Sequence, residues 1–99
     1  TEYGQDAVEA IWYFGAKERI GIVHFRNVRL EEPYYKYSET FIDEGDCDIA
    51  ACTRAFAAVG YEGGIDPDHT PRIAGDGEET QLGWAYAVGQ LRALRLAVY

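Results

Sequence analysis

The chain has 99 residues, of which 47% are hydrophobic and 26% are charged, a composition typical of a soluble globular protein. Its formal net charge is −8 at pH 7, so a phosphate backbone would repel it and we expect no nucleic-acid partner. No apolar run reaches the roughly 18 residues of a membrane span and no signal peptide opens the chain, so we expect a cytoplasmic protein with no membrane partner.

The length of the chain suits one small domain or a piece of a larger one. The sequence begins at Thr1 and contains no methionine, whereas a complete gene product usually begins with Met. We therefore expect residues 1–99 to form a single segment of a longer protein.

The first part of the chain predicts a helix and then a buried strand. Over residues 6–15, Asp6 and Glu9 have the spacing of a capping box, and Gly15 lies near the helix end. Residues 20–25 are largely apolar and rich in β-branched side chains without alternation, which favours a strand buried on both faces, as in a parallel sheet. The apolar stripe of the helix consists of Val8, Ile11 and Trp12.

Residues 26–46 form a long polar connection that contains Pro33 and Gly45. Connections longer than about 12–15 residues are uncommon, and many of them are lids or binding loops. The aromatic side chains of this connection belong either to such a binding loop or to the apolar underside of an ordered loop, and both interpretations remain open. These side chains are Tyr34, Tyr35 and Tyr37.

A second helix is predicted through Val59, with Asp46 or Asp48 as its N-terminal cap. Gly60 fits the position after the last helical residue, where a left-handed backbone is common. The spacing of the apolar residues places one face of this helix in a core. That face consists of Ile49, Cys52, Phe56 and Val59.

The last part of the chain predicts a weak strand over residues 63–66 and, after a polar stretch, a helix over residues 81–98. Arg92 and Arg95 fall in the C-terminal half of that helix, where they interact favourably with its dipole. The predicted buried face of the helix consists of Trp84, Val88, Leu91, Leu94 and Val98.

The predicted order of helix, strand, helix, strand and helix indicates an α/β fold built from β/α units with a parallel sheet. Two central strands cannot cover their own edges. A (β/α)₈ barrel needs roughly 250 residues, so this chain would supply about two of its eight units. We therefore expect a portion of a TIM barrel.

Polar residues follow both predicted strands. In parallel β/α folds the C-terminal ends of the strands carry the reactive groups, so these residues should share one rim. Imidazole and carboxylate ligands suit Mn²⁺, Fe²⁺ or Zn²⁺ better than Ca²⁺. Simpler explanations stay open: a buried structural histidine for His24, an Asx-turn or helix cap for Asp68, and a surface charge for Arg26. The rim residues are His24, Arg26, Asn27, Asp66, Asp68 and His69.

Three segments resemble the mannonate dehydratase family, whose members are xylose-isomerase-like TIM barrels. The first is Val23-His24-Phe25-Arg26-Asn27, the second runs over residues 39–46, and the third is Asp66-Pro67-Asp68-His69. The resemblance covers nearly the whole chain and corresponds to the C-terminal part of the barrel. It implies metal-dependent dehydration of a sugar acid, of the type that converts D-mannonate to 2-keto-3-deoxy-gluconate.

The resemblance also implies roles for individual residues. His24 and Asp68 would bind a catalytic Mn²⁺ or Fe²⁺, and the other protein ligands, a His and a Cys, would come from earlier strands. His69 would act as acid/base, while Arg26, with Asn27 beside it, would bind the substrate. The family also uses a tyrosine as a second acid/base group before the last helix. The nearest hydroxyl in this chain is that of Tyr86, a few positions late. Barrel enzymes of this kind commonly form homo-oligomers, which we expect here by fold analogy alone.

Neither cysteine matches the family's metal-binding Cys. Cys47 and Cys52 are five residues apart, which is neither a CxxC motif nor a disulfide framework, so we expect reduced thiols. Cys47 lies near the predicted start of a helix, where a thiolate is favoured, although a structural cysteine is the commoner case.

Two other functions remain open at this point. One is a metal-dependent isomerase or epimerase on the same barrel, which would move protons at a carbonyl. The other is a non-catalytic α/β module that binds a protein partner through the acidic, tyrosine-rich loop of residues 31–46.

Overall fold

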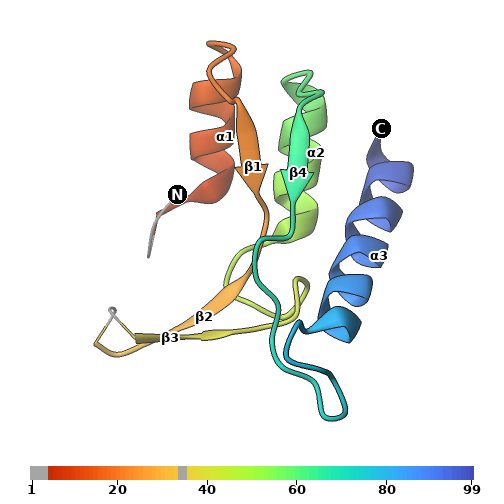
Figure 1. Cartoon of the computed structure of the whole chain (residues 1–99). Coiled ribbons are helices and arrows are strands. Elements are labelled where there is room, and N and C mark those ends of the chain that lie inside the picture. Colours follow the sequence, from red (N-terminus) through yellow and green to blue (C-terminus); the bar gives the residue numbers. More distant parts are fainter. Residues whose placement is uncertain (1–4, 34–35) are drawn as a thin grey trace.

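Helices and strands alternate along the part of the chain that the computed structural model describes, residues 5–33 and 36–99 (Figure 1). The predicted helices and the predicted parallel strands are all present, and a β-hairpin is added between them. The elements are α1 (Ala7–Gly15), β1 (Ile22–His24), β2 (Val28–Glu31), β3 (Lys36–Glu39), α2 (Ile49–Ala58), β4 (Gly64–Asp66) and α3 (Gln81–Val98).

Strands β1 and β4 lie side by side and run in the same direction (Figure 1). His24 is the register partner of Asp66, and the backbone N–H of Phe25 donates to the carbonyl of Asp66 at 2.7 Å. The predicted parallel pairing is therefore confirmed. Because both strands end at the same level, the residues after them emerge at one edge of the sheet.

The connection over residues 26–46 was predicted without secondary structure, and that prediction was wrong. Strands β2 and β3 form an antiparallel hairpin within it, with Val28 opposite Glu39 and Glu31 opposite Lys36. The alternation of half-buried and exposed residues along β2 is the pattern of a half-buried strand. Tyr34 and Tyr35 lie outside the described residues, and Tyr37 is exposed.

Local side-chain chemistry sets the helix ends. Asp6 and Asp48 accept from the backbone N–H three residues later, at 3.0 and 2.8 Å, which confirms the caps of α1 and α2. Gly60 follows α2 with φ of +70°, the left-handed conformation that glycine adopts without strain. Thr80 makes no side-chain cap for α3, and Asp76 accepts from the N–H groups of its first turn instead.

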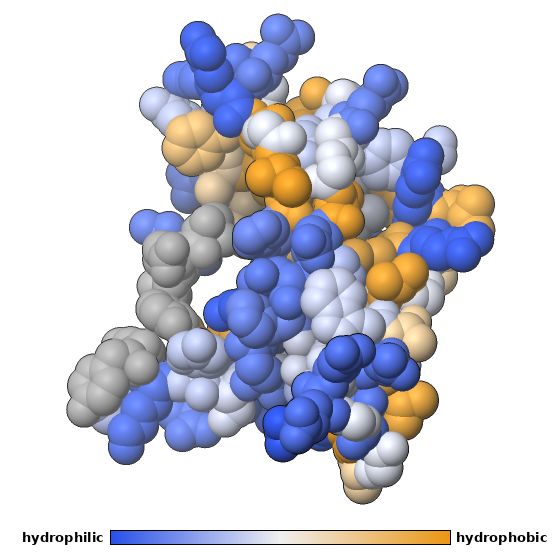
Figure 2. Space-filling view, viewed as in Figure 1, coloured by the Kyte–Doolittle hydropathy of each residue, from blue (hydrophilic) through white to orange (hydrophobic). Residues whose placement is uncertain are grey.

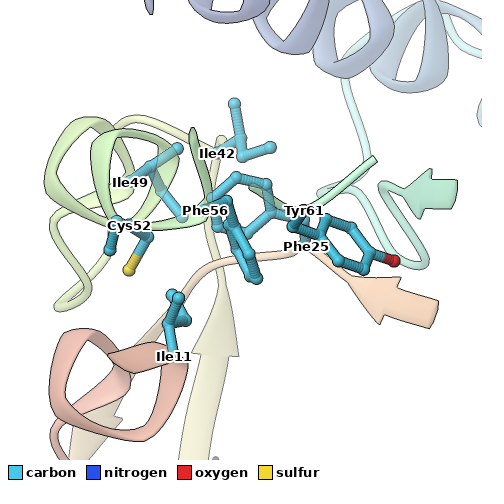
Figure 3. Packing of buried hydrophobic residues seen from close by; sticks show 8 residues of the cluster. Ile11, Phe25, Ile42, Ile49, Cys52, Phe56 and Tyr61 are labelled. Atoms are coloured by element: carbon cyan, nitrogen blue, oxygen red, sulfur yellow. The ribbon is translucent and has the colours of Figure 1, made fainter. Parts of the chain in front are cut away.

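Helices α1 and α2 pack against each other, and the main hydrophobic core forms around them. Ile11 of α1 faces Cys52 of α2, and Phe56 meets Phe25 edge-on with ring centroids 5.7 Å apart (Figure 3). The predicted apolar face of α2 is confirmed, because its Ile49, Cys52 and Phe56 are buried. The core holds α2 against the segment that follows β1 and so positions the end of that strand.

Three positions that were predicted to be buried are exposed in the described chain. Ile22, expected to be buried on both sides of its strand, is 65% exposed, and hydrophobic surface is visible over the upper part of β1 and β4 (Figure 2). Trp12 and Val88 are also exposed. Helix α3 keeps part of its predicted face, since Leu91 and Leu94 pack against the core, and it also approaches its neighbours along Gly83 and Ala87, close to residues 70–71. None of the described helices is long and apolar enough to cross a bilayer.

Candidate active site

Four predicted site residues meet where β1 and β4 end, and we call them the strand-end cluster: His24, Arg26, Asp68 and His69. Asp68 is at the centre. One carboxylate oxygen lies 3.7 Å from Nδ1 of His24, and the other accepts from Nη1 of Arg26 at 3.1 Å and from Nδ1 of His69 at 2.8 Å. Arg26 Nη1 also contacts Nδ1 of His69. The sequence predicted this convergence on one rim, and the structure shows it.

The backbone after β4 directs Asp68 and His69 into the cluster. Asp66 accepts from the N–H of Asp68 at 2.9 Å, so Asp66 rather than Asp68 makes the Asx-turn. Asp68 itself has φ of +65°, a left-handed conformation that Asp tolerates better than most residues. The carboxylate of Asp68 is thereby left for contacts with other side chains.

The simpler explanations for His24 and Arg26 do not fit this geometry. The His24 side chain is 59% exposed, so it is not a buried structural histidine. The Arg26 side chain is 27% exposed and lies between Asp68 and Glu39, whose Oε1 is 3.6 Å from Nη2. Arg26 is therefore an ion-paired group in the wall of the site.

Glu39 is a site residue that sequence reasoning missed. It comes from β3, and its other oxygen, Oε2, is buried with no hydrogen-bond partner among the described residues. The aromatic ring of Tyr37, on the same strand, lies 5.8 Å from the guanidinium carbon of Arg26. Predicting the hairpin from the alternation in β2 would have brought Glu39 back toward Arg26, because Glu39 pairs with Val28 near the end of β1.

The cluster keeps Asp68 ionised. The hydrogen bond from His69 is the largest influence and lowers the pKa of Asp68. Burial opposes this shift, while the charges of His69, His24 and Arg26 lower the pKa further. Asp68 is therefore a carboxylate at neutral pH, able to bind a cation or hold a protonated neighbour.

The donor set fits part of a divalent-metal site. A neutral imidazole nitrogen and a carboxylate oxygen are ligands that Mn²⁺ and Fe²⁺ accept, and a single ion could lie between the donors of His24 and Asp68. Within residues 5–33 and 36–99, no group of three or more His, Cys, Asp and Glu side chains is placed to hold a metal ion. The described residues thus offer two suitable donors rather than a full coordination sphere.

Asn27 lies behind the cluster rather than in its opening. The side chain is buried, and its amide donates to the carbonyls of Ile42 and Cys47, each at 2.9 Å. Its oxygen accepts from the N–H groups of Val28 and Cys47, each at 3.1 Å. These four hydrogen bonds use every donor on the side chain, so the geometry gives Asn27 a structural role and leaves no donor for the predicted substrate contact.

Tyr86 is held away from the cluster by other partners. Its hydroxyl donates to the carboxylate of Asp43, 3.0 and 3.1 Å from the two oxygens, and accepts from Gln90 at 3.0 Å. The ring packs on Phe41 with centroids 4.8 Å apart. Within the described chain, Tyr86 makes no hydrogen bond to the strand-end cluster.

The cluster borders a recess of about 1250 Å³. His24, Arg26 and Asp68 line one part of it, and α1 and residues 46–48 line another. The arrangement can bind an anion through Arg26, a cation through Asp68 and His24, and can exchange a proton through His69.

Comparisons with known proteins identify the family of this chain. The family model of D-mannonate dehydratase (UxuA) matches residues 1–97. A mannonate dehydratase of Thermotoga petrophila is 37% identical over 70 residues, which are 69% of this chain and 19% of that protein. Mannonate dehydratase 2 of Halalkalibacterium halodurans is 31% identical over 72 residues, 72% of this chain and 21% of that protein.

A solved structure shows the same fold. The crystal structure of mannonate dehydratase from Streptococcus suis serotype 2 superposes with a TM-score of 0.69 and 27% identity, over 91% of this chain and 28% of that one. The chain spans about a fifth of the length of the curated relatives that it matches. The predicted resemblance is confirmed by a family model that covers almost every residue, and the chain belongs to the mannonate dehydratase family.

Proposed function

We propose that this chain supplies part of the active site of a metal-dependent dehydratase that converts D-mannonate to 2-keto-3-deoxy-gluconate. The observation that carries the proposal is the strand-end cluster. In a chain of the mannonate dehydratase family, two imidazoles, a guanidinium and a carboxylate converge at the ends of two parallel strands, beside a recess.

The proposed metal ligands in this chain are His24 and Asp68. A bound Mn²⁺ or Fe²⁺ would supply a positive charge that stabilises the substrate as negative charge develops next to its carboxylate. The remaining ligands would come from the rest of the polypeptide, as the family resemblance implies. Asp68 would then hold both the cation and His69, which fixes the imidazole beside the substrate.

The remaining cluster residues have separate proposed roles in the elimination. Arg26, held by Asp68 and Glu39, would grip the substrate carboxylate with two parallel hydrogen bonds. A second acid/base group would take the proton from the carbon next to the substrate carboxylate, and His69 would donate a proton to the hydroxyl that leaves the next carbon as water. The resulting enol would ketonise to the 2-keto acid. Tyr86 stays a predicted second acid/base, but its hydroxyl would have to leave Asp43 to reach the substrate.

We further propose that residues 1–99 form the C-terminal part of a TIM barrel in a cytoplasmic enzyme that self-associates. Support comes from the small parallel sheet: β1 and β4 pair only with each other in the described chain, and Ile22 on β1 is largely exposed. Neighbouring strands of a barrel would pair with the backbone hydrogen-bonding groups at the free edges of β1 and β4.

The test uses the complete polypeptide with Mn²⁺ or Fe²⁺ and D-mannonate, and detects by mass a keto acid that has lost one water. We expect His69→Gln to lower kcat by about 10²–10⁴-fold with little change in KM, because it removes the proton donor. Arg26→Lys should raise KM by about tenfold or more, because a lysine cannot grip a carboxylate in bidentate fashion.

Control variants separate these roles. Tyr86→Phe should change kcat far less than His69→Gln if the Tyr86 hydroxyl remains on Asp43, and Asp68→Asn should lower the bound metal measured by elemental analysis. A product of unchanged mass would indicate an isomerase or epimerase instead. Metal-loaded enzyme that leaves D-mannonate intact would overturn the dehydratase proposal.

A further inference from the structure

The two cysteines of the chain are in contact, although the sequence predicted no link between them. The sulfur atoms of Cys47 and Cys52 are 3.5 Å apart, and both thiols are free. Cys52 is buried in the core on α2, with 1% of its surface exposed, while Cys47 is half-buried just before the cap of the helix.

A structural explanation accounts for part of this contact. Asp48 caps α2, so Cys47 and Cys52 occupy the two positions of a hydrophobic staple, in which the residue before the cap packs on the fourth residue of the helix. A staple needs only two apolar side chains. It does not require both of them to be thiols, and it does not require one of them to be partly open to solvent.

The surroundings hold the two sulfur atoms close together. Asn27 fixes the backbone of Cys47 from both sides, accepting from its N–H at 3.1 Å and donating to its carbonyl at 2.9 Å. Cys52 is fixed by the helix and by the core. The sulfur atoms are 3.5 Å apart and would have to approach to about 2.05 Å to bond.

We propose that Cys47 and Cys52 form an oxidisable dithiol, in which Cys47 reacts with hydrogen peroxide and Cys52 then closes an intrachain disulfide. This proposal does not depend on the proposed dehydratase activity. The recess of about 1250 Å³ that is lined by His24 and Asp68 is also lined by both cysteines, and Cys47 is the more exposed of the two, so a small oxidant in the recess reaches Cys47 more easily.

The order of reaction follows from the environments of the two sulfurs. The hydrogen bond from Cys52 lowers the pKa of Cys47 to about 7, so much of Cys47 is thiolate at neutral pH. The same contact and burial raise the pKa of Cys52, which therefore stays a thiol until it attacks. Cys47 is thus the nucleophile, and Cys52 is the resolving residue.

The chemistry balances in two steps. The Cys47 thiolate attacks one peroxide oxygen, the O–O bond breaks, and hydroxide leaves and takes up a proton to become water, so Cys47 becomes a sulfenic acid. The sulfur of Cys52 then attacks the sulfur of Cys47, the S–O bond breaks, and the departing hydroxide takes the Cys52 proton to form a second water. Two thiols lose two electrons, and one peroxide is reduced to two waters.

The test exposes the reduced protein to equimolar hydrogen peroxide, alkylates the remaining thiols under denaturing conditions and digests with trypsin. Cleavage after Lys36 and Arg54 places both cysteines in one peptide, residues 37–54. We expect this peptide to lose two hydrogens and carry no alkyl group, and to recover two alkylatable thiols after reduction with dithiothreitol.

Single variants test the assigned order. Cys52→Ala should stop at a sulfenic acid on Cys47, which dimedone traps. Cys47→Ala should lose its remaining thiol roughly tenfold or more slowly than the wild type, because Cys52 is buried and protonated. A purely structural staple predicts that both wild-type thiols survive the same dose, and that result would overturn the proposal, as would Cys47→Ala reacting as fast as the wild type. If Cys52→Ala fails to fold, the mass of the wild-type peptide decides alone.

Discussion

Asp68 contacts every other member of the strand-end cluster, at 2.8 Å from His69, 3.1 Å from Arg26 and 3.7 Å from His24. Its left-handed backbone, with φ of +65°, and the Asx-turn made by Asp66 place it there. The sequence could predict that these side chains share a rim, because parallel strands end at the same edge. It could not predict that Asp68 would be the shared partner, because that depends on one turn conformation.

The substitution Asp68→Asn tests the electrostatics of the cluster. Asparagine keeps the shape and tolerates the left-handed backbone, but it removes the negative charge. The pKa of Asp68 is lowered in the folded protein, so its stabilisation is complete above the ordinary value of 3.8 and is lost as the pH falls through the lower folded value. We expect the variant to unfold at lower urea concentration than the wild type near neutral pH.

In acid, the wild type and Asp68→Asn should converge in stability, because the wild-type carboxyl is then protonated. The matched control is Glu78→Gln, an exposed position on the loop before α3, which should change the free energy of unfolding by less than about 0.5 kcal/mol. A difference for Asp68→Asn that stays constant from neutral pH into acid would contradict the assigned pKa shift.

At the scale of elements, Asn27 joins separate parts of residues 26–46, which were predicted to be one connection without secondary structure. It binds the start of β2, the carbonyl of Ile42 and both backbone groups of Cys47. Gly45 passes so close that an added Cβ would lie 2.1 Å from the Asn27 oxygen. The hairpin and the segment before α2 are therefore locked together beside Arg26.

The substitution Asn27→Ala should lower the free energy of unfolding by about 2–4 kcal/mol, because buried backbone groups of residues 28, 42 and 47 lose their partners. Urea unfolding monitored by tryptophan fluorescence measures this change. Ser38→Ala, which removes one exposed hydrogen bond of β3, is the control and should change stability by less than about 0.5 kcal/mol. If Asn27→Ala lowers the free energy of unfolding as little as the control does, the hydrogen bonds of Asn27 are not needed for stability.

At the scale of the whole molecule, the described chain leaves apolar side chains uncovered. Ile22 on β1 is 65% exposed and Leu96 on α3 is 85% exposed. Both lie on elements that the proposed barrel would cover with further strands and helices. The comparison structure is consistent with this, since the chain matches only 28% of its length.

The substitution Ile22→Thr distinguishes a covered from an uncovered strand. In the isolated chain we expect a change of less than about 0.5 kcal/mol in unfolding free energy, because the side chain is already exposed. In the complete polypeptide we expect a loss of about 2 kcal/mol or more, because a buried ethyl group is replaced by a hydroxyl. Equally small effects in both, measured by urea unfolding, would contradict the barrel proposal.

The sequence by itself determined the features that depend on neighbouring residues. It located the three helices to within a residue or two, the cap at Asp6, the choice of Asp46 or Asp48 for the second cap, and the parallel strands that bring His24 and Asp68 to one rim. These follow from capping chemistry and hydrophobic periodicity, which act over a few positions. The family resemblance rested on the same short segments.

Only the tertiary structure decided which distant residues meet. It paired Arg26 with Glu39, joined the Tyr86 hydroxyl to Asp43 and buried Asn27 behind the site. Each of these contacts joins residues through a turn, a hairpin or a packed helix. Which side chains meet in these contacts depends on the path of the backbone between them, and residue types and local spacing do not specify that path.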